Sequence, residues 1–191
     1  MNEIRISKFL SLVLRHDPGR IGVVLDASGW VGVQDLLDAM AAHGSPLDRD
    51  DLERIVAVDS KQRYTLDADR ERIRANQGHS VSVDLGLVPV MPPPVLFHGT
   101  PNRNVPAILR DGLRRGNRHH VHLSADTDTA AAVGARRGAC TLLRVDAAAM
   151  HADGYPFCVS ANGVWLTDAV PARYLDRADR HSQPGRDRNP R

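Results

Sequence analysis

Two pairs of basic side chains are placed where the chain could hold an anion. Arg15 is followed by His16 in Arg-His-Asp-Pro, and Arg136 is followed by Arg137 and Gly138. A guanidinium carries a permanent charge with forked donors, and an imidazole exchanges a proton near neutral pH, so both suit a phosphate. Taken alone, each pair is explained more simply by a solvated helix end, where cations offset the helix dipole.

Two further polar segments lie between these pairs. Lys61 and Arg63 alternate in Lys-Gln-Arg-Tyr, so a strand would place both side chains on one face. Residues 74–80, Arg-Ala-Asn-Gln-Gly-His-Ser, lack apolar periodicity and are predicted to form a polar loop. A solvated wing and a plain surface loop are the simplest explanations, so neither segment identifies a site by itself.

His98-Gly99-Thr100 is a candidate of another kind, because it follows the apolar residues 95–97 at the end of a predicted strand. A glycine at such a position lets a ligand approach the backbone, and the two polar side chains beside it can contact that ligand. This segment is therefore a candidate binding site for a small molecule.

His120, His122 and Ser124 alternate along another predicted strand and share one of its faces. Histidine is a common metal ligand, so a metal site is one alternative. Metal sites need further ligands at close spacing, and no Asp, Glu or Cys joins this face. We therefore expect no bound metal.

The elements that must position these residues follow from apolar periodicity and helix breakers. Helices are predicted at residues 4–14, 34–43 and 48–58, followed by a turn and a strand over 59–66. Arg15 and His16 then lie at the end of the first helix. The order helix, helix, helix, strand is typical of a winged-helix domain.

A proline-rich linker divides the chain. Four prolines between residues 88 and 95 cannot continue a helix or a central strand, so a domain boundary is expected there. Strands are predicted at 95–98, 120–124, 140–145 and 164–166, and helices at 104–111 and 127–137. We expect an α+β protein with domains at 1–88 and 89–178 and a disordered tail at 179–191.

Composition narrows the class of protein. The 191 residues include 25 Lys and Arg against 23 Asp and Glu, and the formal net charge is +2. Residues 98–144 carry eight arginines and three aspartates, a local excess that attracts an anion. The two cysteines form no Cys-x-x-Cys pair, which disfavours a structural zinc site. No stretch approaches the roughly 20 apolar residues of a membrane helix. Neither a P-loop nor the dinucleotide-binding motif Gly-x-Gly-x-x-Gly occurs. We expect a reduced, cytoplasmic protein.

Seven motifs in order resemble the NAD-dependent RNA 2′-phosphotransferase family. They are residues 15–18, 61–64, 74–80, 98–100, 120–124, 134–138 and 162–166. Each motif is weak alone, but together they extend over nearly the whole chain. The resemblance implies an N-terminal winged-helix lobe that holds an RNA 2′-phosphate and a C-terminal ADP-ribosyltransferase-like lobe, with a split β-sheet, that holds NAD.

The resemblance also implies a reaction. The family transfers an internal RNA 2′-phosphate, such as one left at a tRNA splice junction, to NAD as co-substrate, and releases RNA 2′-hydroxyl, nicotinamide and ADP-ribose 1″,2″-cyclic phosphate. A 2′-phosphate oxygen first attacks the anomeric carbon of the nicotinamide ribose, which gives an ADP-ribosylated RNA phosphate. The 2″-hydroxyl of that ribose then attacks phosphorus and displaces the RNA 2′-oxygen, which leaves as the RNA 2′-hydroxyl. The expected partners are this RNA and NAD, without metal or membrane, and we expect a monomer.

The same resemblance assigns residues to roles. The family's catalytic Arg-His-Arg-Arg set falls on Arg15, His16, Arg63 and Arg136. Its NAD-binding motifs fall on His98, Gly99, Thr100, His122, Leu123, Ser124, Ser160 and Asn162. Val164 stands where many ADP-ribosyltransferases have Glu, which fits a phosphate nucleophile that needs no carboxylate base. Arg137 stands where the family pattern implies His.

Two alternatives remain open. One is an ADP-ribosyltransferase that acts on another terminal phosphate or on protein. The other is a non-catalytic winged-helix module that binds nucleic acid, which the filled reactive positions in both lobes disfavour.

Overall fold

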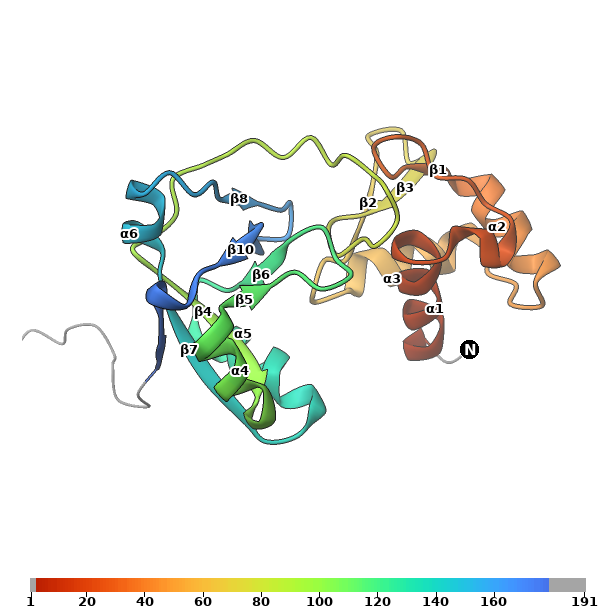
Figure 1. Cartoon of the computed structure of the whole chain (residues 1–191). Helices are drawn as coiled ribbons and strands as arrows, with labels where there is room; N and C mark the ends of the chain where they lie inside the picture. Colours follow the sequence, from red (N-terminus) through yellow and green to blue (C-terminus); the bar gives the residue numbers. More distant parts are fainter. Residues whose placement is uncertain (1–2, 179–191) are drawn as a thin grey trace, which may run out of the picture.

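The computed structural model describes residues 3–178, apart from the side chains of Glu3 and Arg137. Figure 1 shows two parts side by side, one formed by residues 3–75 and the other by residues 95–178. Both parts combine helices with small antiparallel sheets, so the predicted α+β class is confirmed. The tail predicted to be disordered, residues 179–191, lies outside the described residues.

The first part consists of three helices and a small sheet. The helices are α1 (Glu3–Arg15), α2 (Val33–Ala42) and α3 (Arg49–Val58), and the 3-10 helix η1 (Pro18–Ile21) follows α1. The strands are β1 (Val31–Gly32), β2 (Tyr64–Leu66) and β3 (Arg72–Ala75), in the order β1-β3-β2. The three helices match their predicted ranges to within one residue at each end, whereas β1 and β3 were not predicted.

Local sequence explains where the helices of this part begin and end. Pro18 cannot extend α1, so the helix closes at Arg15. The carboxylate of Asp48 caps α3 by accepting a hydrogen bond from the backbone N of Asp51 at 2.7 Å. The apolar faces of the helices and of β3 share one core, which fixes the end of α1 against the sheet.

The second part contains two three-stranded sheets and a strand pair. One sheet is β11-β7-β4, formed by β4 (Val95–Pro101), β7 (Cys140–Asp146) and β11 (Leu175–Arg177). The other is β6-β9-β8, formed by β6 (Val121–Leu123), β8 (Cys158–Val159) and β9 (Trp165–Thr167). The pair is β5 (Leu113–Arg114) with β10 (Ala169–Val170). A bridge between Phe97 and Ser124 joins β4 to the end of β6.

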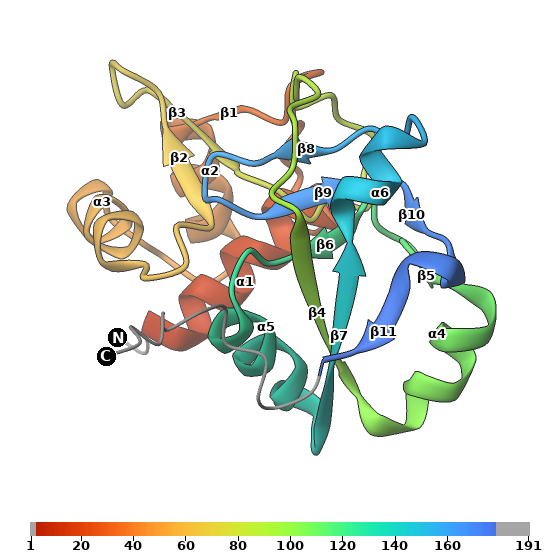
Figure 2. The same ribbon diagram turned by 90° about the vertical axis from the view of Figure 1, so that its left-hand side faces the viewer.

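Helices cover these sheets and connect their strands (Figure 2). They are α4 (Val105–Asp111), α5 (Thr127–Gly134) and α6 (Ala147–Ala152), with the 3-10 helices η2 (Asn102–Asn104), η3 (Ala135–Arg137) and η4 (Ala172–Tyr174). The helix predicted over 127–137 is therefore α5 followed by η3. The second part has an apolar core of its own around Leu96, Leu143 and Phe157.

Two glycines bring α5 against β4. A Cβ on Gly99 would collide with the carbonyl of Ala130, and a Cβ on Gly134 would lie 2.7 Å from the backbone of Gly99. Only glycine permits this approach. The contact sets the position of η3, and with it Arg136, relative to β4.

Residues 76–94 cross from the first part to the second without regular secondary structure (Figure 1). The segment is attached at both ends. The backbone N of Ser80 donates to the carbonyl of Arg15 at 2.8 Å, and that of Val90 donates to the carbonyl of Phe157 at 2.7 Å. It thereby connects the end of α1 to the second part.

Candidate functional site

Arg15 is the last residue of α1, and its guanidinium lies among other cations. Its Nη2 donates to the carbonyl of Arg63 at 3.3 Å, and its Nε has no hydrogen-bond partner among the described residues. Burial lowers the pKa of Arg15, and the charges of Arg63 and Arg118 lower it further. Because a guanidinium stays charged nonetheless, the site holds a cation with unused donors that a bound anion would satisfy.

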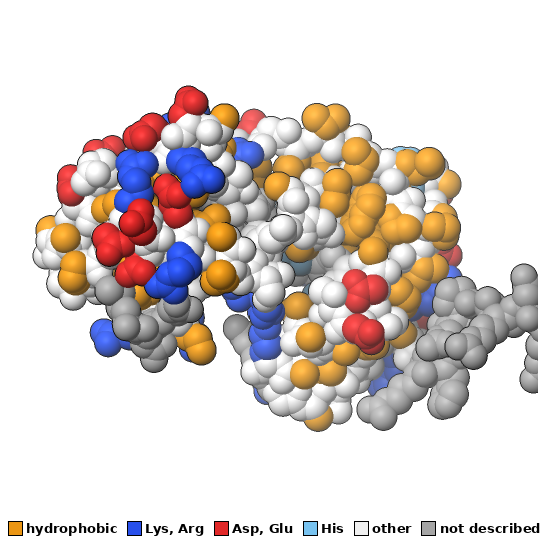
Figure 3. Space-filling model, turned by 180° about the vertical axis from the view of Figure 1, so that it is seen from behind, with side chains coloured by type: hydrophobic (Ala, Val, Ile, Leu, Met, Phe, Trp, Pro, Cys, Tyr) orange, Lys and Arg blue, Asp and Glu red, His pale blue; other side chains and the backbone are white. Residues whose placement is uncertain are grey.

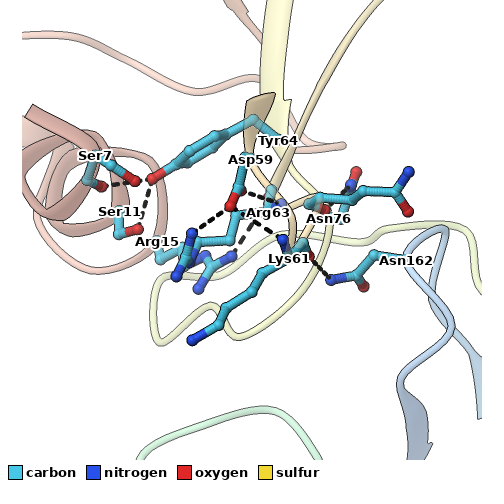
Figure 4. Close-up of polar contacts among 10 residues, drawn as sticks. Ser7, Ser11, Arg15, Asp59, Lys61, Arg63, Tyr64, Asn76 and Asn162 are labelled. Carbon is cyan, nitrogen blue, oxygen red and sulfur yellow. Dashed lines mark hydrogen bonds and ion pairs between the residues drawn. The ribbon is translucent and has the colours of Figure 1, made fainter. Parts of the chain in front are cut away.

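Asp59 organises the turn that carries Lys61 and Arg63. Its carboxylate accepts from the backbone N of Arg63 at 2.7 Å and from that of Lys61 at 3.2 Å, and it is ion-paired with the Arg63 guanidinium. Gln62 has a positive φ of 43°, and β2 begins only at Tyr64. The prediction that Lys61 and Arg63 lie in a strand is therefore wrong, although Figure 4 shows both side chains extending from one side of the turn.

Asn76 supports this turn through hydrogen bonds of its side chain and its backbone. Its Nδ2 donates to the carbonyl of Gln62 at 2.6 Å, its Oδ1 accepts from Thr65 Oγ1 at 2.6 Å, and its backbone N donates to the carbonyl of Arg63 at 2.8 Å (Figure 4). Asn76 is buried. The predicted surface loop over 74–80 is thus corrected: it begins inside β3 and its buried amide supports a turn with two cations.

Cations from the second part approach the same place. The pKa of Lys61 is lowered by burial and by the charges of Arg136 and Arg63. Arg118 acts in the same way on Arg15. Figure 3 shows the surface hollowed between the two parts, with Lys and Arg side chains near the lower end of the hollow. We call Arg15, Lys61, Arg63, Arg118 and Arg136 the cationic cluster. Their summed field attracts a multiply charged anion.

His16 lies beside the cationic cluster as a neutral group. Its Nδ1 is hydrogen-bonded to Ser80 Oγ at 2.9 Å. Burial lowers the pKa of His16, and the charges of Arg15 and Arg118 lower it further. A neutral imidazole has a nitrogen lone pair that can accept a proton, which an imidazolium lacks.

Two histidines of the second part have defined tautomers. His98 Nδ1 lies 3.0 Å from the carbonyl of His122 and must donate to it, which leaves Nε2 as an acceptor. Arg118 Nη1 donates to His122 Nδ1 at 2.8 Å, so the proton of His122 is on Nε2. Burial and the charge of Arg118 lower the pKa of His122 to about 3, and burial also lowers that of His98. The pair offers one acceptor and one donor without charge.

Gly78 and His79 lie where the two parts meet. A Cβ on Gly78 would lie 3.6 Å from both Arg15 Nη1 and His122 Cε1, and the φ of Gly78 is +89°. His79 is 2% exposed, and within residues 3–178 neither of its ring nitrogens has a hydrogen-bond partner. Burial lowers its pKa to about 4. It lines a cavity of about 140 Å³ together with Gly78 and His122.

Several residues assigned to NAD binding have structural contacts in the described chain. Thr100 is buried and accepts from Asn104 Nδ2 at 3.5 Å, and Leu123 lies in the core. Ser124 pairs with Phe97 through backbone hydrogen bonds of 2.8 and 2.9 Å. Their assignment to NAD stays a prediction, as does that of Gly99, which packs against α5.

Ser160 and Asn162 form a link between the two parts. Ser160 Oγ donates to Asn162 Oδ1 at 2.7 Å and accepts from the backbone N of Val164 at 3.1 Å. Asn162 Nδ2 then donates to the carbonyl of Lys61 at 2.9 Å (Figure 4). The loop after β8 therefore also supports the turn of the first part.

The structure brings the predicted Arg15 and Arg63 together, with His16 next to Arg15. Arg136 is close enough to Lys61 for its charge to lower the pKa of Lys61. Sequence reasoning did not single out Asp59, Arg118 or the burial of Asn76 and His79. For Asp59 the available signal was its position at the end of α3, four residues before Arg63. For the buried pair the signal was a run of polar residues around a glycine, which a surface loop explains equally well.

Residues 3–178 contain neither a group of metal ligands nor a membrane-spanning helix. No three His, Cys, Asp or Glu side chains are grouped so that they could hold a metal ion. No helix of that range has the length and apolar character needed to span a membrane.

Cations from two parts of an α+β chain lie beside histidines whose pKa values are lowered, and this arrangement has the charge and the donors that an anion between the parts would need. The family model described as "RNA 2'-phosphotransferase, Tpt1 / KptA family" matches residues 1–169. The chain therefore belongs to this family.

Relatives of similar length carry the same description. A protein of Agrobacterium fabrum named "Probable RNA 2'-phosphotransferase" is 59% identical over 169 residues, which cover 88% of this chain and 91% of the relative. Proteins of the same name from Trichormus variabilis and Streptomyces coelicolor are 53% and 54% identical, and cover 91% and 90% of this chain and 95% and 93% of the relatives.

Proposed function

We propose that this protein removes an internal 2′-phosphate from RNA by transferring it to NAD, with release of nicotinamide and ADP-ribose 1″,2″-cyclic phosphate. The observation that carries the proposal is the cationic cluster, in which Arg15, Arg63 and Arg136 come from three distant segments. Family membership and the names of the relatives support the same reaction.

The two parts take separate tasks in this proposal. Residues 3–75 act as a winged-helix lobe that holds the RNA 2′-phosphate, because Arg15 and Arg63 both belong to it. Residues 95–178 act as an ADP-ribosyltransferase-like lobe that holds NAD. Their three-helix and split-sheet architectures are compatible with these names.

The arginines supply position and charge stabilisation. Fork-shaped donors bind phosphoryl oxygens in a fixed geometry, and the hydrogen bonds to an ionised group are about twice as strong as neutral ones. Arg63 is already held by Asp59, so its remaining donors are directed before the substrate arrives. Preorganised donors of this kind stabilise charge that develops on phosphorus during transfer without reorganisation.

The histidines provide uncharged polar contacts. His98 Nε2 can accept from a ribose hydroxyl, and His122 Nε2 can donate to an oxygen, which fits the ribose of NAD. NAD supplies the electrophilic anomeric carbon and the nicotinamide leaving group. His16, neutral and held by Ser80, is placed to accept a proton from a hydroxyl or to hold the phosphate.

The test is incubation of the protein with NAD and an oligoribonucleotide that carries one internal 2′-phosphate. We expect release of nicotinamide and an RNA 2′-hydroxyl. Arg63→Ala should lower kcat/KM about 10³-fold, and Arg63→Lys should not restore it, because the fork is lost. Arg110→Ala, at an exposed position on α4, is the control and should retain activity.

The acceptor decides between the proposal and its alternatives. Nicotinamide release with a 5′-terminal phosphate but not with the internal 2′-phosphate would replace the proposal with ADP-ribosylation of another group. RNA binding with no turnover of NAD would replace it with a non-catalytic module.

A further inference from the structure

A second concave surface lies beside the cationic cluster. Residues of α1 and of the end of α3 line a groove of about 330 Å³, among them Ile4, Lys8, Ile55 and Val58. We call it the α1–α3 groove. Arg63 lines it as well, so this groove is continuous with the proposed 2′-phosphate site.

The groove has an apolar surface exposed to solvent. Ile4 is 69% exposed and Val58 is 64% exposed, although most other apolar residues of α1 are buried or half-buried. Single exposed apolar side chains are common on proteins. Two that line one groove, on different helices, instead provide a surface on which a planar aromatic group can pack.

Basic groups border this apolar surface. Lys8 is exposed on α1, and Arg63 forms the wall shared with the cationic cluster. Asp59 also contributes to the lining, but its side chain is only 6% exposed and is ion-paired with Arg63, so it presents little free negative charge. Proteins bind single-stranded nucleic acid with a positively charged groove and side chains against which the bases pack, and those side chains are usually aromatic. In the α1–α3 groove the aliphatic side chains of Ile4 and Val58 would take that place.

We propose that the α1–α3 groove binds the RNA nucleotide adjacent to the one that carries the 2′-phosphate. The base of that nucleotide packs against Val58 and Ile4, and its phosphate lies near Lys8. The inference rests on the proposed function, because the 2′-phosphate at Arg15 and Arg63 is what brings the neighbouring nucleotide to the groove.

The experiment compares trinucleotides whose central residue carries the 2′-phosphate. One has all three bases, one lacks the 5′ base and one lacks the 3′ base. With the unmodified protein we expect removal of one of these bases to lower kcat/KM about tenfold, the size expected when one aliphatic side chain loses the base that covers it. In Val58→Ser this difference between intact and abasic substrate should fall to twofold or less.

A matched control and a second variant complete the design. Val24→Ser changes another exposed valine of the first part, 84% exposed, and should keep the tenfold difference. Lys8→Ala should raise KM for the intact trinucleotide about threefold and weaken its dependence on salt. Circular dichroism of each variant checks that the fold is retained.

The outcomes separate this inference from the function on which it rests. No turnover of any 2′-phosphorylated trinucleotide by the unmodified protein would overturn the proposed function. Turnover with equal kcat/KM for intact and abasic substrates would overturn the groove proposal alone. The groove proposal would also be overturned if Val58→Ser left the tenfold difference in place. It would likewise be overturned if Val58→Ser changed only the sedimentation of the protein, a result that would make the groove an interface between copies.

Discussion

The buried His79 should make the stability of the fold depend on pH between about 6.5 and about 4. Its pKa is lowered from 6.5 to about 4 in the folded chain, so the unfolded chain binds the proton more readily in this window. The contribution of neutral His79 to the free energy of unfolding is therefore fully present above the pKa of the unfolded chain. It is lost as the pH falls toward the lower pKa of the folded chain. From about pH 7.5 to about pH 5, His79 alone should remove ~2 kcal/mol from the free energy of unfolding.

Urea denaturation at a series of pH values measures this effect. His79→Gln has no titrating ring, so its free energy of unfolding should fall by ~2 kcal/mol less than that of the unmodified protein over the same interval. His151→Gln, at an exposed position on α6, is the control and should follow the unmodified protein. Parallel curves for His79→Gln and the unmodified protein would refute the reasoning, because the other histidines contribute equally to both.

Three further substitutions test individual contacts. Asp59→Asn removes the ion pair that holds Arg63, and should lower kcat/KM about tenfold to a hundredfold in the 2′-phosphate assay; unchanged kinetics would contradict the positioning role. Asn76→Ala leaves the carbonyl of Gln62 without its amide partner and should reduce the free energy of unfolding by ~2 kcal/mol in urea. Gly99→Ala forces a Cβ into α5 and should lower the melting temperature sharply in calorimetry, whereas small effects there would mean that α5 can move away.

Local patterns determined the helices but not the sheet of the first part. Short stretches of sequence contain the apolar periodicity of α1, α2 and α3 and the helix breaker Pro18. β3 has the sequence Arg-Ile-Arg-Ala, with one large apolar residue, and becomes a strand only because it pairs with both β1 and β2. Such pairing depends on residues about 10 to 40 positions away, so no local pattern contains it.

The candidate site divides in the same way. Arg15, His16 and Arg63 were identified by the resemblance because side chains of these types at fixed spacing carry a recognisable chemistry. Asn76 and His79 acquire their burial from contacts between segments, and a polar string predicts exposure when those contacts are unknown. The groups proposed to contact the substrate are thus easier to predict from sequence than the groups that hold them.

The division of the cationic cluster between arginine and lysine has a physical reason. Burial and, after it, the neighbouring like charges favour deprotonation, and both causes lower the pKa values of Arg15 and Lys61. A lysine can lose its proton when it is buried among positive charges, whereas an arginine keeps its proton at any physiological pH.

The chain has only two lysines, Lys8 and Lys61, and both are exposed at the border of the surface proposed to bind RNA. The half-buried positions that must keep charge and fork geometry, Arg15 and Arg63, are arginines. Most arginines in so arginine-rich a sequence are uninformative. These two are informative because replacement by lysine would permit loss of the charge on which the proposed phosphate binding depends.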